Sequence, residues 1–341
     1  MKISFLVPHL KVSGGVRIIL EYASRLALRG HEVTVYVQSG NPIRRTLANF
    51  FHLGYPNWIA HFCARIIRVP TFTPDTIAVG DVLIATTHQT ALATKDFSTS
   101  LGRQFYLLQH DEGLYHGDRV LVDRAYYLPQ KKIVVATWLK DLLKEKYKQD
   151  AALLVNPIDR ELFHPVQREK HDGVRILLLD HTYEWKGTKE GVEVVVELKK
   201  KYPEIRLIGF GARQAKSVHE FDEYYYNLPQ GKLAWLYSNC DIFLCPSWDE
   251  GFGLPSLEAM ACGTAVMTYD NGGSRDFAFH EKTALVAPRR DEKRLAEELE
   301  RLVKDSTLRE QIARGGYEFV ATMPTWKEQS KRLEGVLGRE K

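Results

Sequence analysis

Short apolar runs alternate with helical stretches in two consecutive series, and this alternation restricts the fold more than any other feature. The first series begins with an apolar run at residues 3–7, a helical stretch at 16–29 and an apolar run at 31–37. The second begins in the same way at residues 174–179, 188–202 and 205–208. Short apolar runs joined by amphipathic helices indicate buried parallel strands with crossover helices. The sequence therefore predicts an α/β protein with two Rossmann-like, doubly wound domains that face each other across a central cleft.

Two prolines interrupt the alternation between the two series. Pro157 and Pro165 lie in a stretch without periodicity, which predicts a linker near residues 156–168. We therefore place an N-terminal domain at residues 1–160 and a C-terminal domain at 161–321. Further strands and helices of the two domains are expected at 82–86, 104–108, 132–136, 232–238, 241–244, from 255 onward, at 265–269, at 284–286 and in a charged helical tail from 291.

The composition is that of an ordinary globular protein and excludes several classes. The chain has 341 residues, with 44% hydrophobic and 26% charged residues, and a formal net charge of +4. This charge is too small to predict a nucleic-acid partner. Its four cysteines form no C-x-x-C pair, and no apolar run approaches the roughly 20 residues of a membrane span. We expect a cytoplasmic protein with reduced thiols.

Residues 43–70 do not follow the alternation. This segment combines aromatic and branched apolar residues with interspersed arginines, in two parts that meet near Gly54. It predicts either a pair of amphipathic helices in peripheral contact with the inner face of a membrane, or ordinary helices whose apolar face packs on the domain core. The second interpretation is favoured, because core faces greatly outnumber membrane-binding faces among amphipathic helices.

Residues 245–276 carry the most specific local pattern of the chain. Glu250 and Glu258 are separated by seven residues, with a glycine-rich turn between them. Pro255 suits the first turn of a helix, and Gly263 suits the position just after its end. The free N–H groups and the dipole at such a helix N-terminus form a site for phosphate. Two carboxylates beside this site predict a phosphorylated ligand that carries hydroxyl groups.

This stretch closely resembles the E-x7-E signature of family 4 retaining glycosyltransferases, which have the GT-B fold. The resemblance extends over nearly the whole chain and is most specific at residues 241–276. It implies two facing Rossmann-like domains, an N-terminal acceptor domain and a C-terminal donor domain. It also implies that the last helix, within residues 322–341, crosses back to the N-terminal domain.

The resemblance assigns roles to the residues of this stretch. Glu258 would bind the ribose hydroxyls of a nucleotide-sugar. The backbone N–H groups of Phe252, Gly253 and Leu254 would bind the donor sugar and its phosphates. Glu250 would face the donor sugar as a base, a nucleophile or an electrostatic stabiliser.

Further donor-binding candidates follow other predicted strands. Gly14 and Gly15 come after the first strand and let a ligand approach the backbone closely, whereas the absence of G-x-G-x-x-G counts against a dinucleotide oxidoreductase. Lys186 resembles the lysine that neutralises the donor diphosphate. The family usually carries an arginine five positions earlier, where this chain has His181, and a neutral histidine holds a diphosphate less well. Gly211 ends the next strand and is also expected to contact the donor.

Three polar residues follow the apolar strand that ends at Leu108. His110 is the candidate for contact with the donor sugar, and Asp111 and Glu112 are candidates to engage the acceptor hydroxyl. Each of the three could equally be a loop residue with a capping role. The surrounding run also resembles rhamnosyltransferase-type members of the family.

The sequence thus predicts retaining transfer of a sugar from a nucleoside-diphosphate sugar to a glycan, a lipid-linked acceptor or another hydroxyl acceptor. The nucleotide-sugar is a substrate, no cofactor is implied, and no D-x-D metal motif stands at a strand end. We expect a metal-independent reaction. The alternatives are a GT-B nucleotide-sugar epimerase or hydrolase, and a non-catalytic nucleotide-sugar-binding subunit, for which His181 is the motivating feature.

Overall fold

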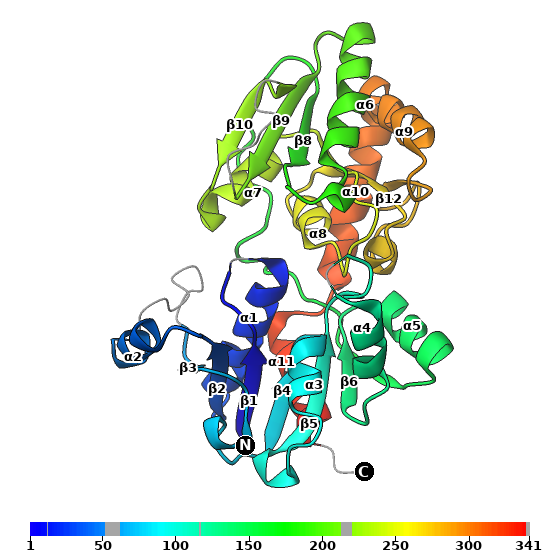
Figure 1. The fold of residues 1–341 in the computed structure, drawn as a ribbon. Coiled ribbons are helices and arrows are strands. Elements are labelled where there is room, and N and C mark those ends of the chain that lie inside the picture. The colour runs from blue at the N-terminus through cyan, green and yellow to red at the C-terminus, as the bar shows by residue number, and fades with distance from the viewer. Residues whose placement is uncertain (12, 52–61, 116, 213–219, 339–341) are drawn as a thin grey trace. The chain divides into compact units, whose positions relative to one another are not determined.

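The computed structural model describes residues 1–11, 13–51, 62–115, 117–212 and 220–338. The chain forms two compact units (Figure 1). Unit 1 comprises Met1–Asn156 together with Lys327–Lys341, and unit 2 comprises Pro157–Trp326. The boundary lies four residues before the one expected from the sequence. Each unit is built on one parallel sheet with helices packed on it, as the alternation of strands and helices predicted.

Unit 1 contains a seven-stranded sheet in the order β3-β2-β1-β4-β5-β6-β7. Polar loops that follow β1, β4 and β5 meet at the carboxyl edge of this sheet, because these three strands are neighbours and parallel. The described strands and helices of the unit are β1 Lys2–Val7, α1 Gly14–Leu28, β2 Glu32–Gln38, α2 Pro42–Phe50, β3 Arg65–Val69, β4 Val82–Ala85, α3 His88–Ala93, β5 Arg103–Leu108, α4 Arg119–Tyr126, β6 Lys131–Val134, α5 Thr137–Tyr147, β7 Ala151–Leu153 and α11 Trp326–Gly338.

The last helix, α11, belongs to unit 1. The imidazole Nε2 of His31 lies 2.7 Å from Glu334 on this helix, and Arg29 forms an ion pair with the same carboxylate. Gln329 donates a 2.7 Å hydrogen bond from Nε2 to the carbonyl of Val155. The predicted return of the C-terminal helix to the N-terminal domain is therefore confirmed.

Unit 2 contains a six-stranded parallel sheet in the order β10-β9-β8-β11-β12-β13. Its core is formed by aliphatic residues of these strands, such as Ile176, Leu178 and Leu244, against helices that include Val195 and Leu299. The described strands and helices are β8 Arg175–Leu179, α6 Thr188–Lys201, β9 Arg206–Gly211, β10 Glu223–Tyr226, α7 Gln230–Ser238, β11 Ile242–Cys245, α8 Leu254–Ala261, β12 Ala265–Tyr269, β13 Leu285–Ala287, α9 Glu292–Lys304 and α10 Ser306–Thr322.

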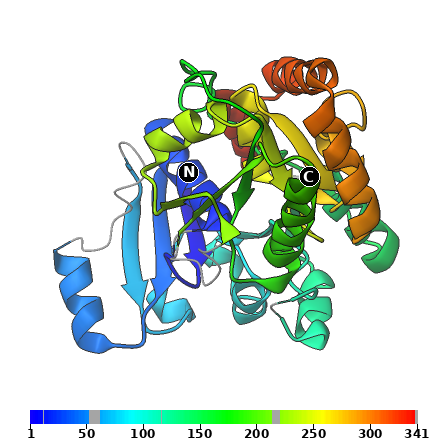
Figure 2. The ribbon, with the colours of Figure 1, turned by 90° about the horizontal axis from the view of Figure 1, so that it is seen from above.

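The segment 43–70 differs from both sequence-based interpretations. Residues 65–69 form strand β3, paired in parallel with β2, rather than a second helix, because the β-branched side chains of this run suit a strand and the edge of β2 is available for pairing. Helix α2 forms beside β3 at the outer edge of unit 1 (Figure 1, Figure 2). Residues 52–61, which belong to the same prediction, lie outside the described residues.

Helix α2 does not have the core face that was favoured. Ile43 is 71% exposed and Phe50 is 76% exposed. The polar residue Asn49 instead faces the sheet, where its side-chain amide donates to and accepts from the backbone of Arg68 at 2.9 and 2.8 Å. Among the described residues, no helix combines the length and the apolar character that crossing a membrane requires.

Candidate functional site

The loop after β11 holds Glu250 in a fixed position. The Glu250 N–H donates to the carbonyl of Asn271 at 2.9 Å, and Glu250 forms a parallel bridge with Gly272. A Cβ atom on Gly273 would lie 2.7 Å from both the Glu250 carbonyl and the Phe252 nitrogen, so only glycine lets the two segments approach this closely. The glycine pair and the first glutamate of the predicted motif are thus parts of one structure.

Helix α8 begins directly after this loop, with the predicted start signals in place. Gly253 has a φ of +92° and precedes the helix, and Pro255 lies in its first turn. The carbonyl of Gly253 accepts the first intrahelical hydrogen bonds. In the part of the chain that the structure describes, the N–H groups of Phe252, Gly253 and Leu254 have no acceptor. Unpaired donors at a helix N-terminus are what an anionic phosphate requires.

Glu258 lies on the inner side of α8 and is 8% exposed. The hydroxyl of Tyr237 donates to Glu258 Oε2 at 3.2 Å. Burial is the largest cause that raises the pKa of Tyr237 well above its ordinary value, so the phenol remains a neutral donor. Rings of Phe210 and Phe243 pack against Tyr237 at 5.8 and 5.6 Å and fix its orientation. The carboxylate is therefore held in place from one side.

Lys186 comes from a different loop and binds Glu250. Its Nζ atom lies 2.7 and 2.8 Å from the two carboxylate oxygens, although 64 residues separate them. The Lys186 loop is fastened to the Glu250 loop at two points. The Trp248 N–H donates to the carbonyl of Trp185 at 2.8 Å, and a Cβ atom on Gly187, which has a φ of +65°, would lie 2.0 Å from the Pro246 carbonyl oxygen.

A second set of contacts supports the same loop, and the sequence interpretation did not include it. Glu190 on α6 accepts hydrogen bonds from Trp248 Nε1, at 2.8 Å, and from the Tyr269 hydroxyl. The guanidinium of Arg290 lies 3.9 Å from the Trp248 ring, within cation–π range. These residues follow no recognisable motif, and only the aromatic character of position 248 marked it in the sequence.

The His181 ring is held in position by its own loop. The Tyr183 backbone N–H donates to His181 Nδ1 at 3.1 Å. The His181 ring packs on Tyr183 at 4.6 Å, and Tyr183 stacks on Trp185 at 4.4 Å. Position 181 therefore carries an imidazole that its own loop orients, in place of the arginine expected here.

The donor-binding candidates of unit 2 share one edge of its sheet. Gly211 ends β9, His181 and Lys186 follow β8, and Glu250 follows β11, and these three strands are adjacent and parallel. The Gly211 carbonyl accepts from the N–H of Asn227 at 2.8 Å. The carboxyl edge of a parallel sheet is where ligands bind in doubly wound folds.

Unit 1 brings its own candidates to the corresponding edge. Gly14 and Gly15 form the first turn of α1 instead of preceding it, because the Ser13 side chain caps the helix by accepting from the Val16 N–H at 3.3 Å. The Gly15 carbonyl accepts from Gln109 Nε2 at 3.1 Å. The loops after β1 and β5 therefore meet.

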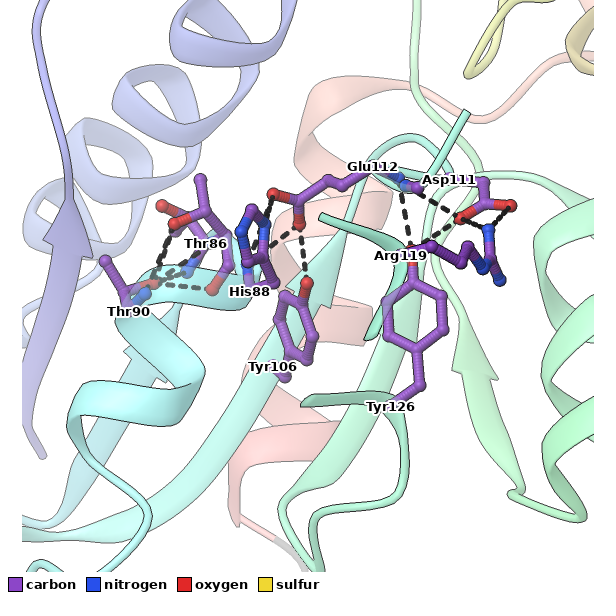
Figure 3. A network of polar contacts seen from close by, with 10 residues as sticks. Thr86, His88, Thr90, Tyr106, Asp111, Glu112, Arg119 and Tyr126 are labelled. Carbon is purple, nitrogen blue, oxygen red and sulfur yellow. Dashed lines mark hydrogen bonds and ion pairs between the residues drawn. The ribbon is translucent and has the colours of Figure 1, made fainter. Parts of the chain in front are cut away.

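His110 and Asp111 lie on the loop after β5. The His110 ring lies 6.4 Å from that of Tyr115. Asp111 is 4% exposed and accepts from Arg119 at 3.0 and 3.1 Å (Figure 3). Its Oδ1 also accepts from the Tyr126 hydroxyl at 3.2 Å. These contacts occupy both oxygens of Asp111 with partners inside the unit.

In the described ranges, no three His, Cys, Asp or Glu side chains are grouped so that they could hold a metal ion. The positive charge at the site in unit 2 comes from Lys186 and from the N-terminus of α8. The order of these groups along residues 174–276 agrees with a known family. Residues 159–319 match the family of group 1 glycosyl transferases. This part of the chain is therefore similar to that family.

Two curated glycosyltransferases are similar to parts of the chain. A D-inositol 3-phosphate glycosyltransferase of Stackebrandtia nassauensis is 35% identical over 107 residues, which cover 31% of this chain and 24% of the relative. An N,N'-diacetylbacillosaminyl-diphospho-undecaprenol alpha-1,3-N-acetylgalactosaminyltransferase of Campylobacter jejuni is 30% identical over 142 residues, which cover 41% of this chain and 38% of the relative. The chain therefore matches well under half of either relative.

Solved structures are similar over the whole chain. HepE of Anabaena, crystallised with UDP and glucose, superposes with a TM-score of 0.75 at 16% identity and covers 99% of both chains. This likeness establishes the GT-B fold, with two Rossmann-like domains. The family match and the fold agree with the resemblance stated from the sequence.

Proposed function

We propose that this protein is a retaining glycosyltransferase that moves a sugar from a nucleoside-diphosphate sugar to a hydroxyl group of a glycan or a lipid-linked acceptor. The supporting observation is the group formed by Lys186, Glu250 and Glu258 beside the N-terminus of α8. It combines a cation, open N–H donors and two carboxylates. HepE was crystallised with UDP and glucose, and the Campylobacter relative is by name a sugar transferase acting on a lipid diphosphate.

The groups of the site match the charges that develop in such a transfer. When the bond between the anomeric carbon and the diphosphate breaks, negative charge grows on the leaving phosphate and positive charge on the sugar ring. Lys186 and the N–H groups of Gly253 and Leu254 stabilise the leaving diphosphate. Glu258 accepts hydrogen bonds from the ribose hydroxyls, and Glu250 faces the sugar. The acceptor oxygen forms its bond on the face that the phosphate leaves, and the phosphate takes the acceptor proton.

Positive charge supplied by the protein makes a divalent cation unnecessary in this scheme. Lys186 supplies a side-chain cation in this scheme and is paired with Glu250 in the structure. We therefore propose that donor binding and transfer are metal-independent. No cofactor takes part, since the nucleotide-sugar is itself a substrate.

No observation favours the alternatives of an epimerase, a hydrolase or a non-catalytic binding subunit. One comparison, of nucleotide release with and without an acceptor, distinguishes these alternatives from a transferase. A transferase releases nucleotide rapidly only when an acceptor is present, a hydrolase or epimerase turns over the donor without one, and a binding subunit shows affinity without turnover. A donor screen by thermal shift comes first, with UDP-, TDP- and GDP-sugars in the presence and absence of EDTA. A shift for one nucleotide class that survives EDTA supports the proposal, and no shift with any nucleotide contradicts it.

We also propose peripheral contact with the cytoplasmic face of a membrane through α2. Its exposed apolar residues Ile43, Leu47 and Phe50 follow helical spacing and lie on one face, and are 71%, 45% and 76% exposed. Phe51, directly after the helix, is 60% exposed. The opposite face is polar, since Asn49 bonds to the backbone of Arg68 and Arg45 to the carbonyl of Ser39. An apolar helix face turned away from the core is typical of helices that lie in a membrane interface.

Vesicle co-sedimentation tests this contact. Replacing Phe50 and Phe51 together by serine should release the protein from phosphatidylglycerol-containing vesicles, because it removes most of the apolar area that would enter the interface. Tyr226→Ser is the matched control, since Tyr226 is 58% exposed on a strand of unit 2. Equal binding of the double variant and the control would contradict the contact.

A further inference from the structure

Glu112 is a carboxylate at the carboxyl edge of the unit 1 sheet, and the basic side chain beside it is the imidazole of His88. In the described part of the unit, no lysine or arginine forms an ion pair with it. Its Oε1 accepts from the Tyr106 hydroxyl at 2.5 Å and from the His88 backbone N–H at 2.9 Å (Figure 3). Its Oε2 accepts from His88 Nδ1 at 2.7 Å and shares the His88 backbone N–H at 3.2 Å. All of these donors can be neutral groups.

The neighbouring Asp111 shows the opposite arrangement. Arg119 pairs with both of its oxygens, and the Tyr126 hydroxyl and the Gly113 N–H occupy further acceptor positions. Asp111 is 6% exposed at its side chain, whereas Glu112 is 19% exposed. Of the two carboxylates predicted as candidates for the acceptor hydroxyl, Asp111 is paired with an arginine inside the unit, whereas Glu112 has no lysine or arginine partner among the described residues and is more accessible to solvent.

The partners of Glu112 hold it in one orientation. Tyr106 is buried, and burial is the main cause that raises the pKa of its phenol well above the ordinary value, so it donates permanently. His88 begins α3 and presents both its backbone N–H and its ring Nδ1 to the same carboxylate. The Tyr106 hydroxyl, the His88 ring and the His88 backbone N–H, which both oxygens share, are three donors for the about four acceptor positions of a carboxylate, so there is capacity for one more donor.

Glu112 also lies among the loops that form this edge. Thr86, after β4, donates to the carbonyl of Leu6 at the end of β1, at 2.7 Å. Gln109, three residues before Glu112, donates to the carbonyl of Gly15. The ends of β1, β4 and β5 are thus tied together around Glu112, at the edge where doubly wound sheets bind their ligands.

We propose that Glu112, oriented by His88 and Tyr106, binds a hydroxyl group of the sugar acceptor in unit 1. This inference rests on the transferase function proposed above and assigns the acceptor contact within it. Glu112 accepts a hydrogen bond from the incoming hydroxyl, and its negative charge strengthens that bond. His88 is a positioning residue, because it acts on the acceptor through Glu112.

Saturation-transfer NMR on the full chain tests the inference, with methyl α-D-glucopyranoside, methyl α-D-mannopyranoside and methyl α-L-rhamnopyranoside as probes in the presence of UDP. Glu112→Gln keeps the shape of the side chain and removes its charge, and it should weaken glycoside binding by about tenfold. Asp118→Asn is the matched control, because Asp118 caps α4 at the surface and asparagine caps a helix equally well. The control should retain the signal of the wild type.

The role of His88 has its own test. His88→Ala should lose glycoside binding, and His88→Asn should restore most of it, because the asparagine amide can still donate to Glu112. A purely structural role would lower the thermal stability of both variants to a similar degree without this difference in binding.

Two results would overturn the inference. One is an unchanged glycoside signal in Glu112→Gln, and the other is the absence of any glycoside signal in the wild type while nucleotide-sugars still shift its melting temperature. Failure of the proposed function is distinct, since it would appear as the absence of a nucleotide-sugar shift, which depends on residues of unit 2.

Discussion

Replacing Glu250 by glutamine should tighten the binding of a nucleoside diphosphate while it slows transfer. Without donor, both oxygens of Glu250 hold the Lys186 ammonium, at 2.7 and 2.8 Å. The donor diphosphate requires the same ammonium, so it competes with Glu250 for Lys186. Glutamine removes the negative charge, so the side chain at position 250 competes less well for Lys186. Transfer becomes slower because the carboxylate that faces the sugar is lost.

The size of the effect follows from the environment of the pair. The side chains of Lys186 and Glu250 are 21% and 11% exposed, so solvent screens their attraction only in part. A charge-assisted contact of this kind contributes roughly 1.5–3 kcal/mol net. The glutamine oxygen still accepts one hydrogen bond from Lys186, which keeps part of this energy. We expect the binding free energy of the diphosphate to become more favourable by about 1 kcal/mol, which lowers its Kd about fivefold.

Calorimetry with the nucleoside diphosphate identified in the donor screen measures this change. Asp249→Asn is the matched control, because it removes a negative charge one residue away that is paired with Arg289 and does not bind Lys186. In a Lys186→Ala background, Glu250→Gln should have little effect. Unchanged or weaker diphosphate binding in Glu250→Gln, or equal tightening in Asp249→Asn, would refute the competition.

Three further predictions concern the supports of the site and the stability of the fold. Gly187→Ala should destabilise unit 2 by roughly 2–3 kcal/mol in urea unfolding, because the new Cβ would lie 2.0 Å from the Pro246 carbonyl at a φ of +65°. Tyr237→Phe should weaken nucleotide binding by about 1 kcal/mol in calorimetry, because Glu258 loses the donor that orients it. Burial lowers the pKa of Lys132 to about 8, so the unfolded chain binds more protons above that pH. The contribution of Lys132 to the free energy of unfolding should therefore rise from about pH 8 to pH 10.5, and Lys132→Met should abolish that rise.

Each of these has a result that would contradict it. Gly231→Ala is the control for Gly187→Ala, because its Cβ would meet no atom within 4 Å, and equal losses in the two variants would exclude the clash as the cause. Nucleotide binding by Tyr237→Phe that equals that of the wild type would show that the hydroxyl does not orient Glu258. A rise in stability retained by Lys132→Met would assign the pH dependence to other groups.

Local signals in the sequence were sufficient for most of the fold and for the helix beside the site. The strand at residues 265–269 was predicted because a continuous apolar run is a local signal. The start of α8 near Pro255 was predicted because a proline in the first turn is another local signal. Strand β10, Glu223–Tyr226, was missed since three tyrosines at its centre and end give no apolar run. Its position depends on pairing with β9, which is a tertiary property.

The contacts within the site could not be derived in the same way. Lys186 and Glu250 meet because Gly187 allows one loop to approach Pro246, and no spacing rule connects residues 64 positions apart. His88 was not recognised at all, because its partner Glu112 follows another strand. The orientation of His181 depends on the Tyr183 backbone N–H, which only the conformation of its loop reveals.

The anomeric configuration of the product tests the central claim most directly. The reaction uses the donor found by the thermal-shift screen, in its α-configured form. Proton NMR determines the linkage of the glycoside formed with the best acceptor, and nucleotide release is measured with and without that acceptor. The account predicts an α-linked product and nucleotide release that depends on the acceptor. A β-linked product would contradict retention, and equal release of nucleotide without acceptor would contradict a transferase.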